Sequence, residues 1–172
     1  MADGLGASAA LAFNALTPFS RSHPPRVCSM TSFRLDAAIT SQAASSLAEA
    51  LALLEQRLGA WAADDAAFAA VLQQAYGVDA GSAEALALRS SLLGEGLGLS
   101  LVADPLDGLL GAYAAADGTA PEVVVLNSTW LAGASAAELE AVLLEELGHA
   151  IDQRLKSLQK NHLAAPVFHS YN

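Results

Sequence analysis

Residues 142–152 read Val-Leu-Leu-Glu-Glu-Leu-Gly-His-Ala-Ile-Asp, and they form the centre of the helix predicted for the C-terminal half. They follow Ser135-Ala-Ala-Glu138, a capping box with serine at the N-cap and glutamate at N3. These signals predict a helix that runs from Ser135 to about Leu158. At about 100° per residue, one broad arc of this helix is apolar and should face the core. It consists of Leu139, Leu143, Leu144, Leu147, Ala150, Ile151 and Leu155.

The opposite face of the same helix is polar. Its members are Glu138, Glu145, His149, Asp152 and Lys156, with Glu146 at the border. Glu145 and His149 lie one turn apart on this face, where carboxylate and imidazole are near enough to hold a single ion. The same geometry also suits a solvated face with i,i+4 pairs, and spacing alone favours that second interpretation.

The sequence before this helix predicts a small β-sheet. Leu97–Ala103 alternates leucine with smaller residues, which favours a strand. Gly111–Ala115 and Glu122–Leu126, whose Val-Val-Val run is β-prone, flank Asp117-Gly118, a strong turn signal. The two segments are therefore expected to pair as a hairpin.

The first half of the chain predicts helices. Three segments qualify, at 41–58, 65–76 and 83–93, ended by Gly59, Gly77 and Gly94 in turn. Asp64 and Ser82 are the expected N-caps of the second and third. Leu47, Leu51, Leu54 and Leu58 form one buried stripe on the first helix. The expected fold is therefore α+β, with N-terminal helices, a small sheet or hairpin, and then a long motif-bearing helix.

Composition limits the classes of function. A chain of 172 residues predicts one domain, and 53% hydrophobic residues with only 6% aromatic ones favour closely packed helices. A net charge of −10 argues against nucleic acid and against an anionic membrane surface as partners. Cys28 is the single cysteine, which rules out an internal disulfide framework. No apolar run reaches the length of a transmembrane helix.

The two ends of the chain differ from its middle. No basic residue precedes the apolar patch at Ala7–Leu16, so no Sec signal peptide is evident. The start is expected to be a disordered leader or a misassigned start with Met30 as the natural one. Residues 156–172 contain no acid, which indicates a truncated or displaced C-terminus. The expected organisation is a leader at 1–35, a helical section at 36–94, a sheet with the motif helix at 95–158, and a disordered or truncated tail at 159–172.

Glu145, Glu146 and His149 carry the candidate chemistry. They stand where a zinc metallopeptidase helix has His-Glu-x-x-His, with a glutamate in place of the first histidine. In the intact motif two histidines bind zinc, and the glutamate between them polarises the attacking water. Zinc also accepts carboxylate oxygen, so Glu145 remains a potential ligand.

The order of hairpin, strand, connection and capped helix resembles the active-site segment of zincins. Val124–Leu131 and 142–152 more closely resemble the matrixin-like or serralysin-like domain of bacterial haemolysin-type (RTX-like) calcium-binding secreted proteins, over residues 97–155. The resemblance implies Glu146 as general base, His149 as metal ligand and Glu145 in the first-ligand position. It also implies an extracellular location, and that the strand near 122–127 is the sheet edge along which a peptide substrate lies.

The chain departs from that pattern in ways that affect metal binding. Asp152 and Leu155 stand where a metzincin has its glycine and third histidine, which leaves His162 or His169 as the remaining candidates for a third zinc ligand. No Gly-Gly-x-Gly-x-Asp repeat is present, and Asp104, Asp107 and Asp117 lack EF-hand spacing, so calcium is not supported within this chain.

Two functions therefore compete. The first is a zinc-dependent endopeptidase that acts on a peptide or protein substrate, made weak by its short ligand set. The second is a non-catalytic structural or interaction module that packs against other domains of a longer parent protein. The sequon Asn127-Ser128-Thr129 is short enough to arise by chance and supports neither function.

Overall fold

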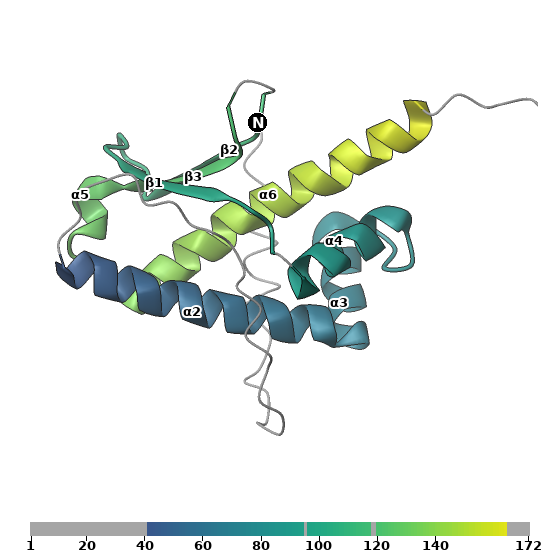
Figure 1. The fold of residues 1–172 in the computed structure, drawn as a ribbon, viewed down its shortest axis with the longest axis horizontal. Helices are drawn as coiled ribbons and strands as arrows, with labels where there is room; N and C mark the ends of the chain where they lie inside the picture. The colour runs from purple at the N-terminus through teal and green to yellow at the C-terminus, as the bar shows by residue number, and fades with distance from the viewer. Residues whose placement is uncertain (1–40, 95, 118–119, 165–172) are drawn as a thin grey trace, which may run out of the picture.

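Helices α2 (Ser41–Ala63) and α6 (Ala136–Ala164) are the two longest elements and lie side by side, running in the same general direction (Figure 1). The computed structural model describes residues 41–94, 96–117 and 120–164. Between the two long helices come α3 (Asp65–Val71), the π-helical turn η1 (Leu72–Tyr76), α4 (Ala83–Leu93), β1 (Ser100–Asp104), β2 (Gly111–Ala114), β3 (Val123–Asn127) and α5 (Ser128–Leu131). The predicted α+β class with a long C-terminal helix is confirmed.

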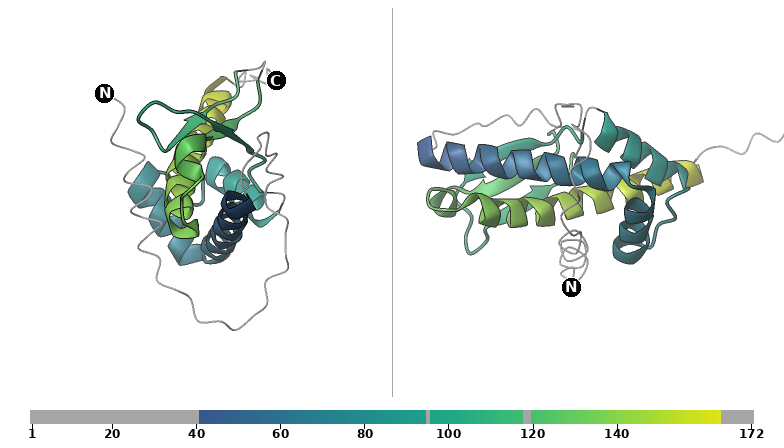
Figure 2. Two further views of the ribbon diagram at one scale, coloured as in Figure 1. Left: turned by 90° about the vertical axis from the view of Figure 1, so that its left-hand side faces the viewer. Right: turned by 90° about the horizontal axis from the view of Figure 1, so that it is seen from below.

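The three strands form one sheet in the order β1-β3-β2. β1 runs parallel to β3, with Leu101 opposite Val124, and β2 runs antiparallel to β3, with Tyr113 opposite Val124. The hairpin pairing expected for 111–115 and 122–126 is confirmed. Helix α6 lies between α2 on one side and the sheet on the other (Figures 1 and 2).

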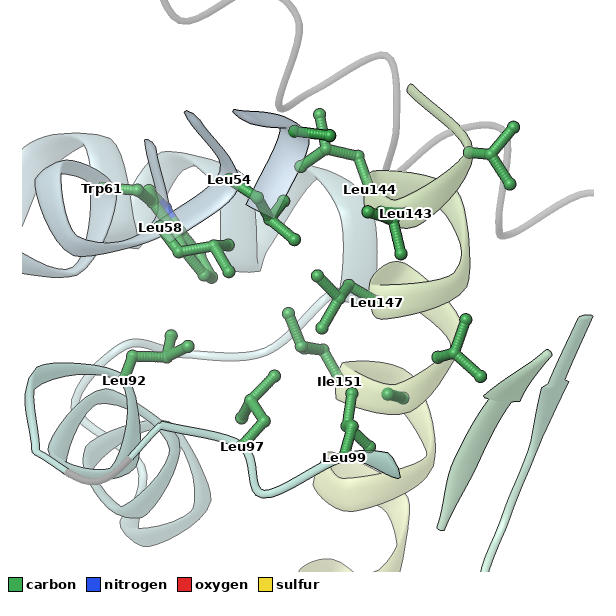
Figure 3. Close-up of a cluster of buried hydrophobic side chains, with 14 of the residues drawn as sticks. Leu54, Leu58, Trp61, Leu92, Leu97, Leu99, Leu143, Leu144, Leu147 and Ile151 are labelled. Atoms are coloured by element: carbon green, nitrogen blue, oxygen red, sulfur yellow. The ribbon is translucent and has the colours of Figure 1, made fainter. Parts of the chain in front are cut away.

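The apolar arc of α6 forms the centre of the core. All seven residues assigned to this arc from the sequence are buried, and none is more than 3% exposed. Leu143, Leu147 and Ile151 point toward side chains of α2, of α4 and of the segment that enters β1 (Figure 3). Full burial of a leucine contributes about 1.5–3 kcal/mol, so this arc is a principal source of stability.

The first helix is longer than predicted. Gly59 was expected to end it, but α2 continues to Ala63 because Trp61 and Ala62 are buried against the core. A glycine inside a helix costs about 1 kcal/mol, which is less than the burial of a tryptophan contributes. Arg89 stabilises the extended end, since its Nε donates to the carbonyl oxygen of Ala62 at 2.7 Å.

The predicted caps of the next helices are confirmed. Asp64 accepts the backbone N–H of Ala67 at 2.9 Å, and the Ser82 hydroxyl accepts that of Ala85 at 3.2 Å. The second predicted helix, 65–76, is α-helical only to Val71 and closes with the π-helical turn η1. Gly77 then ends it in the left-handed conformation, with φ of 65°, as expected.

The described residues do not cover every prediction. Helix α6 passes its expected end near Leu158 and runs to Ala164. The leader expected at 1–35, Gly118 of the predicted turn, and the end of the tail from residue 165 lie outside the described residues.

Candidate functional site

The capping box of α6 forms as the sequence predicts. The Glu138 carboxylate accepts the backbone N–H of Ser135 at 2.9 Å and its hydroxyl at 2.7 Å, and the Ser135 hydroxyl accepts the backbone N–H of Glu138 at 3.4 Å. The two hydrogen bonds from Ser135 hold the pKa of Glu138 below its ordinary value. A helix without a break follows, so Glu145 and His149 stand one turn apart on one face.

The three motif residues differ in their exposure. Glu145 is exposed, His149 is partly buried, and Glu146 is buried with only 7% of its surface accessible. A carboxylate that loses this much water must find compensating contacts. Those contacts come from β2.

Strand β2 presents its open edge to Glu146. The backbone N–H of Asn127 donates to the carbonyl of Leu110 at 2.9 Å, so residues 110 and 127 form a hydrogen-bonded antiparallel pair. Hydrogen-bonded and non-hydrogen-bonded pairs alternate along a ladder. Gly111 and Tyr113 therefore direct their backbone N–H and C=O groups away from β3, and the outward N–H of Tyr113 lies near enough to Glu146 to lower the pKa of its carboxyl.

A glycine allows this close approach between β2 and α6. A Cβ atom added to Gly111 would lie 2.6 Å from Cγ1 of Val142 and 3.1 Å from Oε1 of Glu146. Real Cβ atoms do not tolerate the shorter of these distances, since close-packed interiors have no such slack. Gly111 is thus the residue that lets the sheet edge rest on the motif helix.

The surroundings of Glu146 shift its pKa. Loss of solvent raises the pKa of the carboxyl above its ordinary value, and the neighbouring Glu145 adds to this rise. The positive charge that His149 carries when protonated acts in the opposite direction, as does the backbone N–H of Tyr113. A raised carboxyl pKa is a property of general bases, although structural carboxylates also show it.

A second polar cluster joins the sheet to α6 and was not anticipated from the sequence. The Tyr113 hydroxyl donates to Oε1 of Glu122 at 2.5 Å, and Arg154 of α6 forms an ion pair with the same carboxylate. Arg154 also donates to the carbonyl of Leu97. Burial and the Glu122 carboxylate raise the pKa of Tyr113, so its hydroxyl remains a proton donor. The sequence shows Arg154 eight residues after Glu146 on the same helix, but no local pattern identifies Glu122, 32 residues before Arg154, as its partner.

Two other polar residues of the α6 face, Asp152 and Lys156, pair with each other at 2.5 Å. This is an i,i+4 pair of the kind that the solvated-face interpretation expects. Leu155, in the position of a metzincin third histidine, is 1% exposed and belongs to the core. Its direction excludes that position from any site on the outer face.

The metal donors that the structure describes fall short of a catalytic zinc site. Among the residues whose side chains the structure describes (42–94, 96–117 and 120–157), no group of three or more His, Cys, Asp or Glu residues is placed to hold an ion. Catalytic zinc uses three protein ligands, whereas Glu145 and His149 supply two. The side chain of His162 and all of His169 lie outside the described residues.

The place of β3 in the sheet differs from the prediction. The strand near 122–127 was expected to be the sheet edge, which is wrong: β3 is central, and β2 is the edge nearest the motif helix.

Asn127 of the sequon donates its side-chain amide to the carbonyls of Leu106 and Leu109, each at 2.7 Å, and also caps α5. A glycan on this nitrogen would disrupt those bonds.

Comparisons with protein-family models, with curated proteins and with solved structures gave no match to this chain. Among the described residues, no helix combines the length and apolar character that crossing a bilayer requires.

Proposed function

We propose that this chain is a degenerate zincin-like domain that hydrolyses peptide bonds weakly or not at all. One observation carries the proposal: a buried carboxylate, Glu146, lies at the open edge of β2 beside Glu145 and one turn before His149. This is the arrangement that the resemblance implies, except that β2 replaces β3 as the edge strand.

The proposed chemistry is limited by the donors. Glu146 would act as the general base, since burial raises the pKa of its carboxyl and so makes it a stronger proton acceptor than an exposed carboxylate. Gly111 and Tyr113 would offer the remaining outward backbone groups of β2 to an extended peptide, as in β-strand addition. Glu145 and His149 do not complete a catalytic zinc site, so we derive no step through a metal.

The test begins with the metal. The purified full chain, dialysed against zinc and then against buffer, should retain less than stoichiometric zinc. Glu145→His, which restores the usual imidazole ligand, should bind zinc more tightly than the parent in isothermal titration. Equal or weaker binding by the variant would show that the Glu145–His149 face is not organised for metal.

The second part of the test measures hydrolysis of an unfolded protein substrate. The parent should show little or no activity, and any chelator-sensitive trace should disappear in Glu146→Gln. Glu140→Gln is the control for loss of a buried glutamate of α6 outside the motif, and its activity is compared per folded protein because the change also breaks the ion pair with Arg57. Activity that survives in Glu146→Gln would remove the zincin mechanism. Robust chelator-sensitive turnover by the parent would contradict the proposal that the chain hydrolyses peptide bonds weakly or not at all.

A second function is favoured by a different observation. The sheet face turned away from α6 carries Val102, Ala112 and Val125, which are only partly buried, and Leu110 beside them is 48% exposed. Apolar surface of this kind suits packing against another domain. In this alternative the chain is a non-catalytic module of a longer secreted calcium-binding protein. Zinc retention close to stoichiometric would argue against the alternative.

A further inference from the structure

Tyr113 lies beside two carboxylates from different parts of the chain. Its hydroxyl donates to Glu122, the residue before β3, at 2.5 Å. Its backbone N–H points away from β3 toward Glu146 of α6, whose Oε1 lies 3.1 Å from the position of a Cβ atom added to Gly111. One residue of the edge strand therefore links the sheet to the candidate base.

Arg154 fixes the far side of this link. Its guanidinium donates to both oxygens of Glu122, with Nε at 3.4 Å from Oε1, and also to the carbonyl of Leu97 before β1. The side chains of Arg154 and Glu122 are only 27% and 17% exposed. Charged hydrogen bonds with this little solvent are stronger and more directional than exposed pairs.

The two contact points lie on one rigid helix. Eight residues separate Glu146 from Arg154, a rise of about 12 Å along α6. Tyr113 reaches the first point through its backbone and the second through its hydroxyl and Glu122. A strand held at two points along a helix cannot slide or tilt freely, and Gly111 lets it lie close enough for both contacts.

We propose that Tyr113 is a positioning residue: the chain Arg154–Glu122–Tyr113 locks β2 onto α6 and thereby holds the Tyr113 backbone N–H against the Glu146 carboxylate. The inference rests on the proposed function only in naming Glu146 as the base. The positioning itself needs neither metal nor substrate to be measured.

The experiment is amide NMR on the full chain with Tyr113→Phe, which removes the hydroxyl and keeps the backbone N–H. The amide proton of residue 113 should shift upfield as its bond to a carboxylate weakens. Its hydrogen exchange, relative to that of Val124 on the adjacent strand, should accelerate about threefold to tenfold, the range expected for one lost hydrogen bond. The comparison with Val124 removes any general loss of stability, which a purely structural role would produce.

Two further variants complete the design. Tyr76→Phe is the matched control, because the Tyr76 hydroxyl also donates to α6, at the carbonyl of Gly148 at 3.4 Å, but Tyr76 belongs to η1 and not to β2. It should leave the amide of residue 113 unchanged. Glu122→Gln keeps the shape of the link, weakens the ion pair, and should reproduce the effect of Tyr113→Phe if that variant folds poorly.

The outcomes separate cleanly. An amide of residue 113 that keeps its shift and relative exchange in both Tyr113→Phe and Glu122→Gln overturns the inference. A shift in those variants but not in Tyr76→Phe supports it. Because no zinc or peptide enters the measurement, failure of the metal and hydrolysis tests would leave this result standing, and the reverse also holds.

Discussion

Among single residues, Glu146 of α6 is a buried acid, and loss of solvent is the main cause that raises the pKa of its carboxyl. A carboxyl with a higher pKa in the folded state binds protons more tightly there than in the unfolded chain. Its favourable contribution to stability is complete below the unfolded pKa, near 4.5, and is lost as pH rises through the folded value.

The resulting prediction is that Glu146→Gln is more stable than the parent at pH 7, and that this advantage shrinks as the pH falls to about 4. Urea unfolding at the two pH values measures it. Glu138 provides an internal contrast, because its pKa is lowered. Glu138→Gln should lose stability at neutral pH and approach the parent in acid. An advantage for Glu146→Gln that is the same at both pH values would contradict the assignment of a raised pKa.

Gly111 allows a second prediction at this scale. Gly111→Ala places a methyl group 2.6 Å from Cγ1 of Val142 and should cost about 1–3 kcal/mol, the usual penalty for overpacking. Val142 is β-branched and turns aside with difficulty. In a Val142→Ala background the same change should cost clearly less. A double-mutant cycle by thermal or urea unfolding tests this, and equal penalties in both backgrounds would mean that β2 moves away as a whole.

At the scale of elements, the contact between α2 and α6 contains an ion pair within an apolar interface. Arg57 lies 3.1 Å from Oε1 of Glu140, whose side chain is 12% exposed. The contact is an ion pair rather than an aligned hydrogen bond, since that oxygen has no hydrogen-bond partner among the described residues. Removal of one member would leave a charge with little solvent.

We therefore expect Arg57→Met to destabilise the domain by about 1–3 kcal/mol, because it strands the Glu140 carboxylate. The double variant Arg57→Met with Glu140→Leu should recover most of the loss, since two apolar side chains replace the pair. Chemical denaturation of the three proteins decides between these outcomes. A double variant less stable than either single one would show that the pair itself is strongly favourable.

Elements whose signals are local could be predicted from the sequence. Asp64, Ser82 and the Ser135–Glu138 box each satisfy backbone groups within three residues, so the helix starts were correct. Gly59 failed as a stop because the burial of Trp61 depends on distant parts of the chain. The prediction that β3 lies at the edge of the sheet was wrong for the same reason, because β1, which lies outside the hairpin, pairs with β3 in parallel.

The candidate site divides along the same line. Helical spacing was enough to place Glu145 and His149 on one face and Glu146 at its border. The cluster of Tyr113, Glu122 and Arg154 could not be predicted, because its members come from β2, from the residue before β3 and from α6, and their packing is set by the whole fold.

At the scale of the whole molecule, the helices and the sheet share one hydrophobic core. Two tryptophans report on different parts of it: Trp61 near the end of α2 is 1% exposed, and Trp130 in α5 packs against the core beside the sheet. Shared packing should make unfolding of the two parts cooperative.

The prediction is a single urea transition. Trp130→Phe leaves only Trp61 as a tryptophan probe, and Trp61→Phe leaves only Trp130. Within each variant, fluorescence and far-UV circular dichroism should give the same midpoint. Separate midpoints for the two probes would mean that the helical section and the sheet unfold as independent units.

The side-by-side arrangement of α2 and α6 has a consequence for synthesis of the chain. The apolar stripe of α2 is translated first, yet its main partner begins at Ala136, about 70 residues later. At a translation rate of roughly 5–20 residues per second, about 4 to 15 s pass between synthesis of α2 and synthesis of the first residues of α6. During this interval Leu47, Leu54 and Leu58 lack their native cover. We therefore expect the yield of folded protein to fall when chaperones that bind exposed leucines are depleted during synthesis.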